Sequence, residues 1–245
     1  MIRKTINHTK ECTFIVRVPG PNGFPYPVGT GFFISGEGYF ITAYHVIEGV
    51  NNFSNVRFQQ PDGEHVLNIS LIEKWEHFDI ALLKADLNLN QKRFEKAKNQ
   101  FLNGKEEFPH LIPDFNQYFE GTPIYTFGFP LPKVKIIEQN HITVGLEALC
   151  PRVTSAIISS IYDYIRPIRS KEDTKIYTID KPLHPGNSGG PAILSENGKV
   201  FGVCVASQLF SLQKLNIHEI QLPANYGFVV SLENIKDYLL REISL

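Results

Sequence analysis

A single serine, Ser188, lies in the glycine-rich stretch PGNSGGP at residues 185–191. Glycines let the backbone take positive φ and turn its N–H groups toward a point outside the chain. Acyl transfer requires this combination, because the nucleophilic oxygen must lie beside donors for the carbonyl oxygen that becomes negative in the transition state. Gly, Asn and Ser are also the commonest turn residues, so composition alone favours a surface turn. A catalytic interpretation therefore depends on a base and an acid elsewhere in the chain.

A candidate base and a candidate acid precede that serine. His45 ends an apolar segment, and Asp79 comes directly before the wholly apolar run IALL. Each alone is more typical of a structural residue, a hydrogen-bonded histidine or a turn aspartate. In the order His45, Asp79, Ser188 they have a joint chemical interpretation. Ser188 attacks a carbonyl, His45 moves the proton, and Asp79 holds the imidazole tautomer and offsets its charge. The N–H groups of the loop Gly186, Asn187 and Ser188 would form the oxyanion hole.

The elements that must position these residues are short. Runs rich in β-branched and aromatic residues recur between Gly, Pro, Asn and Asp, and few windows show a helical period. The candidate strands are residues 12–18, 30–35, 39–43, 56–59, 65–73, 80–84, 122–127, 142–149, 153–160, 175–180, 191–194, 200–207 and 227–231. This pattern predicts an all-β protein with two tandem antiparallel β-barrels of about six strands each. We place the first in residues 1–118 and the second in residues 119–245.

Two segments depart from the β pattern. Residues 87–118 predict a helical insert that ends before Gly104. One face of that helix carries Leu89, Arg93, Ala97 and Phe101. The insert is either a solvated helix or a docking surface for a protein partner. Residues 231–241 predict a short C-terminal helix that Ser231 caps. Its apolar face, directed at the second barrel, carries Leu232, Ile235 and Leu239.

Composition narrows the classes of partner. The chain has 245 residues, 42% of them hydrophobic and 20% charged, which describes a globular protein with a core that needs no disulfides. Its formal net charge of −1 gives no footprint for nucleic acid or for anionic lipid. The eight histidines include no HExxH pattern, so we expect neither a metal nor another cofactor.

The cysteines and the termini bear on location. Cys12, Cys150 and Cys204 are odd in number and far apart, which indicates free thiols in a reducing compartment. The first residues lack the apolar segment of a secretory signal, and apolar stretches such as residues 200–206 are too short to span a bilayer. These features predict a cytoplasmic protein that does not enter a membrane.

Five motifs together resemble a known family. They are GTGFFIS at 29–35, ITAYHVIEG at 41–49, DIALLK at 79–84, GFP at 128–130 and HPGNSGGP at 184–191. In this order they resemble the chymotrypsin-fold (trypsin-like) serine peptidases, and the nearest branch is the bacterial HtrA/Deg-like catalytic domain. The resemblance implies two perpendicular barrels with the active site between them, His45 and Asp79 on the first and Ser188 on the second. No PDZ module follows the last helix, so we do not expect the peptide sensing and cage assembly of HtrA proteins.

The resemblance also places the residues that would contact substrate. Pro182 takes the position where trypsin-like enzymes have the aspartate that binds Lys or Arg. The sides of the pocket would be Val205, Ala206, Ser207 and Gly227. None is charged, so we expect an apolar, small-to-medium side chain before the scissile bond. The strand edge at residues 205–207 would bind the polypeptide backbone as an added strand, and His184 is a further candidate for a substrate contact.

Asn187 bears on activation. In the digestive enzymes of the family an aspartate at this position pairs with a freshly cut N-terminal ammonium, and the oxyanion loop then forms. A neutral asparagine cannot make that ion pair. We therefore do not expect activation by N-terminal cleavage, and any switching would come from loop rearrangement on binding.

Three functions compete. The leading one is an active serine endopeptidase that forms an acyl-enzyme. The alternative is a latent protease-fold regulatory or binding subunit that only a partner activates, docked through the insert. By analogy alone, peptidases of this kind resemble effectors of bacterial stress or anti-phage systems. An α/β-hydrolase esterase fits poorly, because its GxSxG elbow is missing and its histidine would follow the serine.

Overall fold

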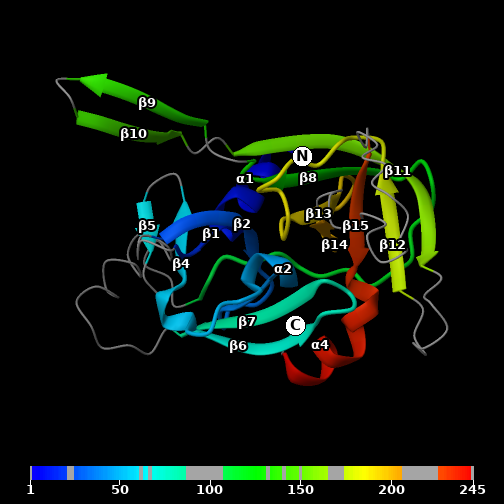
Figure 1. Cartoon of the computed structure of the whole chain (residues 1–245). Helices are drawn as coiled ribbons and strands as arrows, with labels where there is room; N and C mark the ends of the chain where they lie inside the picture. Colours follow the sequence, from blue (N-terminus) through cyan, green and yellow to red (C-terminus); the bar gives the residue numbers. More distant parts are fainter. Residues whose placement is uncertain are drawn as a thin grey trace, which may run out of the picture.

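The computed structural model describes residues 2–20, 25–60, 63–65, 68–86, 107–130, 133–139, 142–148, 151–164, 174–205 and 226–243. Their strands all pair antiparallel, in a seven-stranded sheet, a six-stranded closed barrel and a two-stranded hairpin (Figure 1). The predicted all-β fold class is confirmed. No helix in the described part of the chain combines the length and apolarity needed to cross a bilayer.

The seven-stranded sheet draws on the first third of the chain. Its order is β5-β4-β1-β2-β3-β7-β6. The strands are β1 (Thr13–Pro19), β2 (Pro25–Phe33), β3 (Tyr39–Ala43), β4 (Arg57–Gln60), β5 (Gly63–His65), β6 (Asn68–Trp75) and β7 (Ile80–Asp86). The strand predicted at residues 65–73 is thus two strands. The sheet's own core is a cluster of phenylalanines, with the rings of Phe14 and Phe58 stacked 3.9 Å apart.

The barrel draws on the second half of the chain and closes in the order β11-β12-β15-β14-β13-β8. Its strands are β8 (Pro123–Gly128), β11 (Arg152–Tyr164), β12 (Thr174–Ile179), β13 (Pro191–Leu194), β14 (Val200–Val205) and β15 (Gly227–Ser231). The boundary that we placed between residues 118 and 119 stays a prediction, although it falls between the strands of the two halves.

Besides the core of the sheet and the core of the barrel, one apolar cluster contains residues of both halves. Alternate residues of a strand point to opposite faces. Phe33 and Phe40 therefore enter the first core, whereas Phe32 and Ile41 lie with barrel residues such as Val203 in the shared cluster. The central strands of the sheet are buried on both faces, which explains why their sequences are continuous apolar runs.

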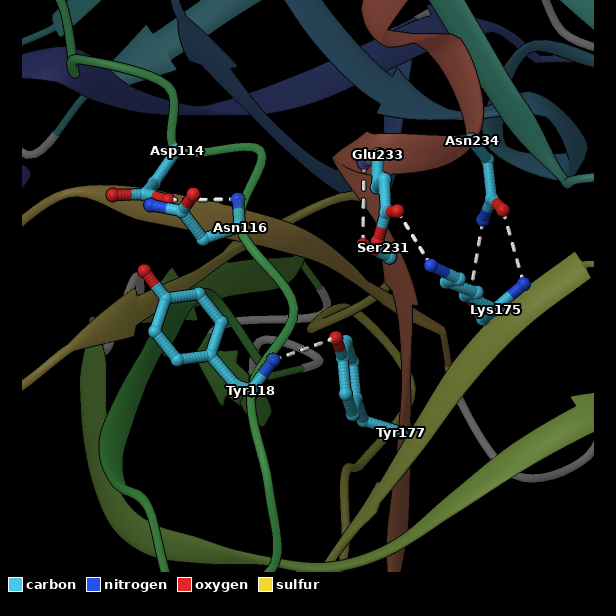
Figure 2. Close-up of polar contacts among 8 residues, drawn as sticks. All are labelled: Asp114, Asn116, Tyr118, Lys175, Tyr177, Ser231, Glu233 and Asn234. Atoms are coloured by element: carbon cyan, nitrogen blue, oxygen red, sulfur yellow. Dashed lines mark hydrogen bonds and ion pairs between the residues drawn. The ribbon is translucent and has the colours of Figure 1, made fainter.

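An extended segment, residues 107–122, joins the halves. Phe108 N–H donates to the Gly36 carbonyl (3.0 Å) in the first half, and Asp114 N–H donates to the Val200 carbonyl (2.7 Å) in the barrel. Figure 2 shows the next contact, from Tyr118 N–H to the Tyr177 hydroxyl at 3.2 Å. Residues 107–118 are not helical, contrary to our expectation for the insert. Pro109 and Pro113 disfavour helix there, and Phe108 is buried. The helix predicted nearer residue 100 lies outside the described residues.

The C-terminal helical segment is anchored on the barrel by polar contacts. It consists of a 3-10 turn, η4 (Leu232–Ile235), and α4 (Lys236–Glu242). The Ser231 hydroxyl accepts the Glu233 N–H (3.2 Å), so the predicted cap is confirmed, and Leu232, Ile235 and Leu239 are buried as expected. Asn234 exchanges two 3.0 Å hydrogen bonds with the Lys175 backbone, and Lys175 forms an ion pair with Glu233 (Figure 2).

Short helical turns aside, two elements were not predicted. A helix, α1 (Ile2–Cys12), precedes β1, where we expected a strand to begin at Cys12. The strand β9 (Lys133–Gln139) pairs with β10 (Ile142–Ala148), and only β10 was expected. Figure 1 shows this hairpin extending away from the body of the molecule, at the upper left.

Candidate active site

Strand pairing brings the predicted base and acid together. β3 and β7 are antiparallel, with Ala43 opposite Ile80. The residues that follow β3 therefore lie beside the residue that precedes β7. His45 belongs to the four-residue helix α2 (Tyr44–Ile47) that starts where β3 ends, and Asp79 comes directly before β7. The pairing of two buried strands thus brings His45 and Asp79, which are distant in sequence, close together in space.

Asp79 contacts this short helix through three oxygens. Its Oδ2 lies 2.7 Å from His45 Nδ1, its Oδ1 accepts the His45 backbone N–H (2.9 Å), and its carbonyl accepts the Tyr44 N–H (3.0 Å). These bonds satisfy N–H groups that a helix start leaves unpaired. A carboxylate can only accept, so Nδ1 carries the proton and Nε2 is left as the acceptor that a general base needs. The exposed fractions are 21% for the His45 side chain and 20% for that of Asp79.

The backbone at Asp79 has an uncommon conformation. Its φ is +54°, the one positive value at a non-glycine position among the described residues. Aspartate tolerates this region better than most residues do. The preceding turn is closed by hydrogen bonds from Phe78 N–H to the Trp75 carbonyl and from Asp79 N–H to the Glu76 carbonyl. This turn reverses the chain so that the carboxylate faces α2.

The loop that carries Ser188 joins β12 to β13 and lies against the first half. Thr30 N–H, on β2, donates to the Ser188 carbonyl at 2.8 Å. Gly189 has a φ of +82°, and a Cβ atom there would lie only 2.8 Å from Ala43 N. Ala43 is two residues before His45. The absence of a side chain at Gly189 thus lets the serine loop approach the residues that hold the base. Ser188 itself is 3% exposed.

The residues predicted for the oxyanion hole form a tight turn. Asn187 N–H donates to the His184 carbonyl (2.9 Å), and Gly186 at the third position has a φ of +94°. A third-residue φ of about +80° defines a type II turn, which favours the Pro-Gly pair found here, whereas type I requires about −90°. Gly186 is buried, and its N–H donates to no acceptor among the described residues. The turn therefore leaves a backbone donor beside the serine.

The predicted substrate-binding residues are only partly described. Pro182 is exposed, and Ala206 and Ser207 lie outside the described residues. Val205 is fully buried in the shared cluster, so its side chain does not line a surface. Gly227 leaves space that Leu183 occupies, because a Cβ atom at Gly227 would lie 2.5 Å from Leu183 Cγ.

Sequence reasoning missed two residues here. Leu183 precedes the serine loop and stands beside Gly227. Thr30, in the GTG of β2, is fully buried, and its hydroxyl donates to the Gly186 carbonyl at 2.6 Å. The only sequence signal for either was its proximity to a glycine motif. In the described ranges no group of three or more His, Cys, Asp and Glu could hold a metal ion.

The comparison with family models gives the class. The model of the trypsin-like peptidase domain matches residues 29–203, a range that includes His45, Asp79 and Ser188. The chain therefore belongs to the trypsin-like peptidase family.

Two of the relatives are named as DegP proteins. The chain is 29% identical over 182 residues to a probable periplasmic serine endoprotease, DegP-like, of Bartonella henselae, an alignment that covers 74% of the chain and 28% of the relative. It is 31% identical over 170 residues to a serine protease DegP homolog of Plasmodium falciparum, covering 62% and 18%. The chain thus spans less than a third of the length of these relatives.

Two solved structures have the same fold. The active form of the Rv3671c protease of M. tuberculosis is 21% identical, with a TM-score of 0.63 over 96% of this chain and 82% of that one. The HtrA-type protease AlgW with tripeptide is 18% identical, with a TM-score of 0.64 over 100% and 64%. At these identities the likeness concerns the fold, and it agrees with the chymotrypsin-like architecture expected from the sequence.

Proposed function

We propose that this member of the trypsin-like peptidase family is a serine endopeptidase whose catalytic residues are His45, Asp79 and Ser188. The observation that carries the proposal is the double contact of one carboxylate with His45, at Nδ1 and at the backbone N–H. It fixes both the tautomer and the position of the imidazole. The serine loop lies against the strand that leads into this histidine. The proposal thus assigns a base, its orienting acid and a nucleophile to the region where the two halves join.

The reaction follows from these positions. Ser188 Oγ attacks the carbonyl carbon of the scissile bond while His45 Nε2 takes the hydroxyl proton. The tetrahedral oxyanion collapses, the C–N bond breaks, and His45 returns the proton to the leaving amine. Water then attacks the acyl-enzyme by the same route, which releases the carboxylate product and regenerates the serine. Asp79 stays ionised and stabilises the imidazolium in both halves of the cycle.

The oxyanion would be stabilised by backbone donors. The N–H groups of Gly186 and Ser188 flank Asn187 in the loop, and the type II turn at residues 184–187 supports this role because it leaves Gly186 N–H without an acceptor in the described chain. Losing one such donor typically lowers kcat by about 10²- to 10³-fold. The formed turn supports the active enzyme over the latent subunit.

We further propose a preference for a small or medium apolar side chain before the scissile bond. Pro182 brings no charge to the pocket. Leu183, which occupies the space that Gly227 leaves, brings no charge either. Substrate contacts of Val205 would come from its backbone, since its side chain is buried. An acidic or basic side chain would lose its hydration without gaining a partner.

Location and partners remain proposals. Cys12 and Cys204 are buried free thiols, which is compatible with the cytoplasmic location expected from the sequence. The Bartonella relative is named as periplasmic, however, so fractionation of cells that express the chain is the direct measurement. Docking of a protein partner through residues 87–106 likewise stays a prediction.

The proposal is tested by incubating the purified protein with a peptide library and identifying the new termini by mass spectrometry. We expect cleavage after Ala, Val and similar residues, and no cleavage by Ser188→Ala. The matched control is Ser195→Ala, because Ser195 follows β13 and its backbone N–H bonds the Pro123 carbonyl, away from the catalytic pair. Cleavage that persists in Ser188→Ala, or that falls mainly after Lys and Arg, would contradict the proposal.

A further inference from the structure

The oxyanion turn is held by a residue of the other half of the molecule. Thr30, on β2, is fully buried. Its N–H donates to the Ser188 carbonyl (2.8 Å) and its hydroxyl to the Gly186 carbonyl (2.6 Å). One residue therefore contacts the carbonyls on both sides of Asn187. The same hydroxyl accepts the Phe129 N–H at 3.2 Å, so its lone pair and its proton are both engaged.

Within the described part of the chain, the Asn187 side chain does not anchor the turn. It is 5% exposed, and its Oδ1 is buried without a hydrogen-bond donor among the described residues. At this position an ionic side chain could anchor the loop, but the amide oxygen of Asn187 contributes no such bond. The side-chain hydrogen bond that reaches the Gly186 carbonyl comes from Thr30.

A turn with glycine at its third position needs such an anchor. Types I and II differ by reversal of the central peptide, with φ of the third residue changing from about −90° to about +80°. Glycine takes both values at similar cost. A glycine therefore leaves the chain around it easy to move unless other bonds hold it. The hydrogen bond from Thr30 fixes the peptide that follows Gly186, and it holds the observed turn, with its φ of +94°, against the first half.

The choice of threonine fits this role. Its β-branched side chain has few rotamers. Its γ-methyl group lies near Gly190, since a Cβ atom there would be 3.4 Å from Thr30 Cγ2. With few rotamers available, the hydroxyl is held in the direction of the Gly186 carbonyl, to which it donates.

We propose that Thr30 is a positioning residue that holds the oxyanion turn, and with it the Gly186 N–H, in place against the first half. The inference rests on the proposed function, in which Gly186 N–H stabilises the oxyanion. Thr30 does not touch substrate. It acts through Gly186, and it makes the turn independent of N-terminal cleavage by supplying the anchor from within the chain.

The experiment compares Thr30→Val with Thr30→Ser and with Thr13→Val. Valine keeps the shape of threonine and removes only the hydroxyl, whereas serine keeps the hydroxyl. Thr13 is the matched control, because it is fully buried on the neighbouring strand β1 and its hydroxyl donates to the Thr9 carbonyl at 2.7 Å. The measurements are kcat and KM on an apolar peptide substrate, and the affinity of a peptidyl boronic acid, whose tetrahedral adduct places an oxygen in the oxyanion hole.

We expect Thr30→Val to lower kcat by about 10- to 100-fold, less than outright loss of a donor. KM should stay within about threefold, because substrate binding precedes the need for the donor. Boronate affinity should fall with kcat, Thr30→Ser should recover most of both, and Thr13→Val should lose stability alone. If Thr30→Val does not fold, Thr30→Ala takes its place with the same expectation.

Two results separate the inference from the proposed function. Equal kcat and boronate affinity in Thr30→Val and Thr13→Val, with Ser188-dependent activity in the unmodified protein, would overturn the role of Thr30 alone. Absence of any hydrolysis that depends on Ser188 would overturn the proposed function, and the inference would fall with it.

Discussion

The two halves of the molecule position their share of the candidate site by different means. In the first half, Asp79 contacts His45 through carboxylate oxygens, so side-chain chemistry sets the geometry. In the barrel half, the loop that carries Ser188 is held by backbone groups, including Gly189 N–H on the Cys204 carbonyl at 2.8 Å. A substitution in the first half can therefore remove a side-chain contact directly, whereas a substitution in the serine loop must act through the backbone.

This difference predicts two kinds of damage. A change of side-chain chemistry in the first half should abolish activity and leave the fold intact. A change of backbone conformation in the serine loop should affect folding and activity together, because the same hydrogen bonds serve both. Thr30 belongs to the first half in sequence, but its side chain bonds the backbone of the serine loop in the second half. It therefore combines side-chain chemistry with the positioning of a backbone.

The largest expected effect is that of Asp79→Asn. The amide keeps the size of the carboxylate but no longer imposes the tautomer with the proton on Nδ1 of His45, so kcat/KM should fall by about 10⁴-fold. The matched control is Asp114→Asn, since Asp114 Oδ1 also accepts a backbone N–H, from Asn116 at 2.9 Å, far from the site. A kcat/KM of Asp79→Asn within tenfold of that of the unmodified protein would contradict the claim that the Asp79 side chain sets the geometry of the first half.

The buried thiols test whether the halves open separately. Cys12 lies in the shared cluster and Cys204 in the barrel core, and burial raises the pKa of both thiols, so each stays protonated and unreactive. Each should react with a thiol reagent at least about 10³-fold more slowly than an unfolded thiol. We expect equal rates, because the shared cluster couples the halves. Mass spectrometry of pulse-labelled peptides measures both, and much earlier labelling of one cysteine would contradict a single cooperative unit.

Gly189→Ala tests whether backbone conformation positions the serine loop in the barrel half. Its φ is +82°, and the new Cβ would lie 2.2 Å from the Thr30 carbonyl oxygen, so we expect a loss of about 3 kcal/mol in stability together with loss of activity. The control is Gly121→Ala, where φ is +84° and nothing lies within 4 Å. That variant should lose only about 1 kcal/mol, from backbone strain. Denaturant unfolding measures both, and equal losses would show that close approach to the first half does not matter.

The smallest expected effect concerns Asp180, a carboxylate that binds the backbone without a catalytic role. The hydrogen bond from Ile157 N–H (2.9 Å), helped by Lys181, holds the pKa of that carboxyl below its usual range. A lowered folded-state pKa stabilises the protein above the ordinary carboxyl pKa, and this contribution is lost as the pH falls through the folded value.

Asp180→Asn should therefore be less stable than the unmodified protein at pH 7, and the difference should shrink below about pH 3. Because the side chain is 37% exposed, water screens the interaction and the difference should be about 0.5 kcal/mol or less. Urea unfolding at several pH values measures it. A difference that grows as the pH falls would reverse the sign that we expect.

Much of the fold follows from local pattern. The strands β3, β13 and β15 have the predicted bounds, because apolar β-branched runs between turn residues leave little choice. The helix α1 could not be predicted, because its buried face includes polar Thr9, whose hydroxyl contacts the Thr5 carbonyl and the Tyr125 hydroxyl. That face is recognisable only when the barrel lies against it.

The site follows the same division. His45, Asp79 and Ser188 stand in motifs with a chemical order, so sequence could nominate them. Thr30 and Leu183 could not be nominated, because their importance comes from atoms more than forty residues away, the Gly186 carbonyl and the space at Gly227. Contacts between residues distant in sequence carry no local signal.

The most direct test of the account is labelling of the purified protein with a fluorophosphonate probe, with Ser188→Ala as the control. The probe reacts only with a serine that a base activates and an oxyanion hole stabilises. We predict rapid labelling of the protein alone, located at Ser188 by peptide mapping and absent from Ser188→Ala. A folded protein that takes up no probe would contradict a site preformed by Asp79, His45 and the Thr30-anchored turn.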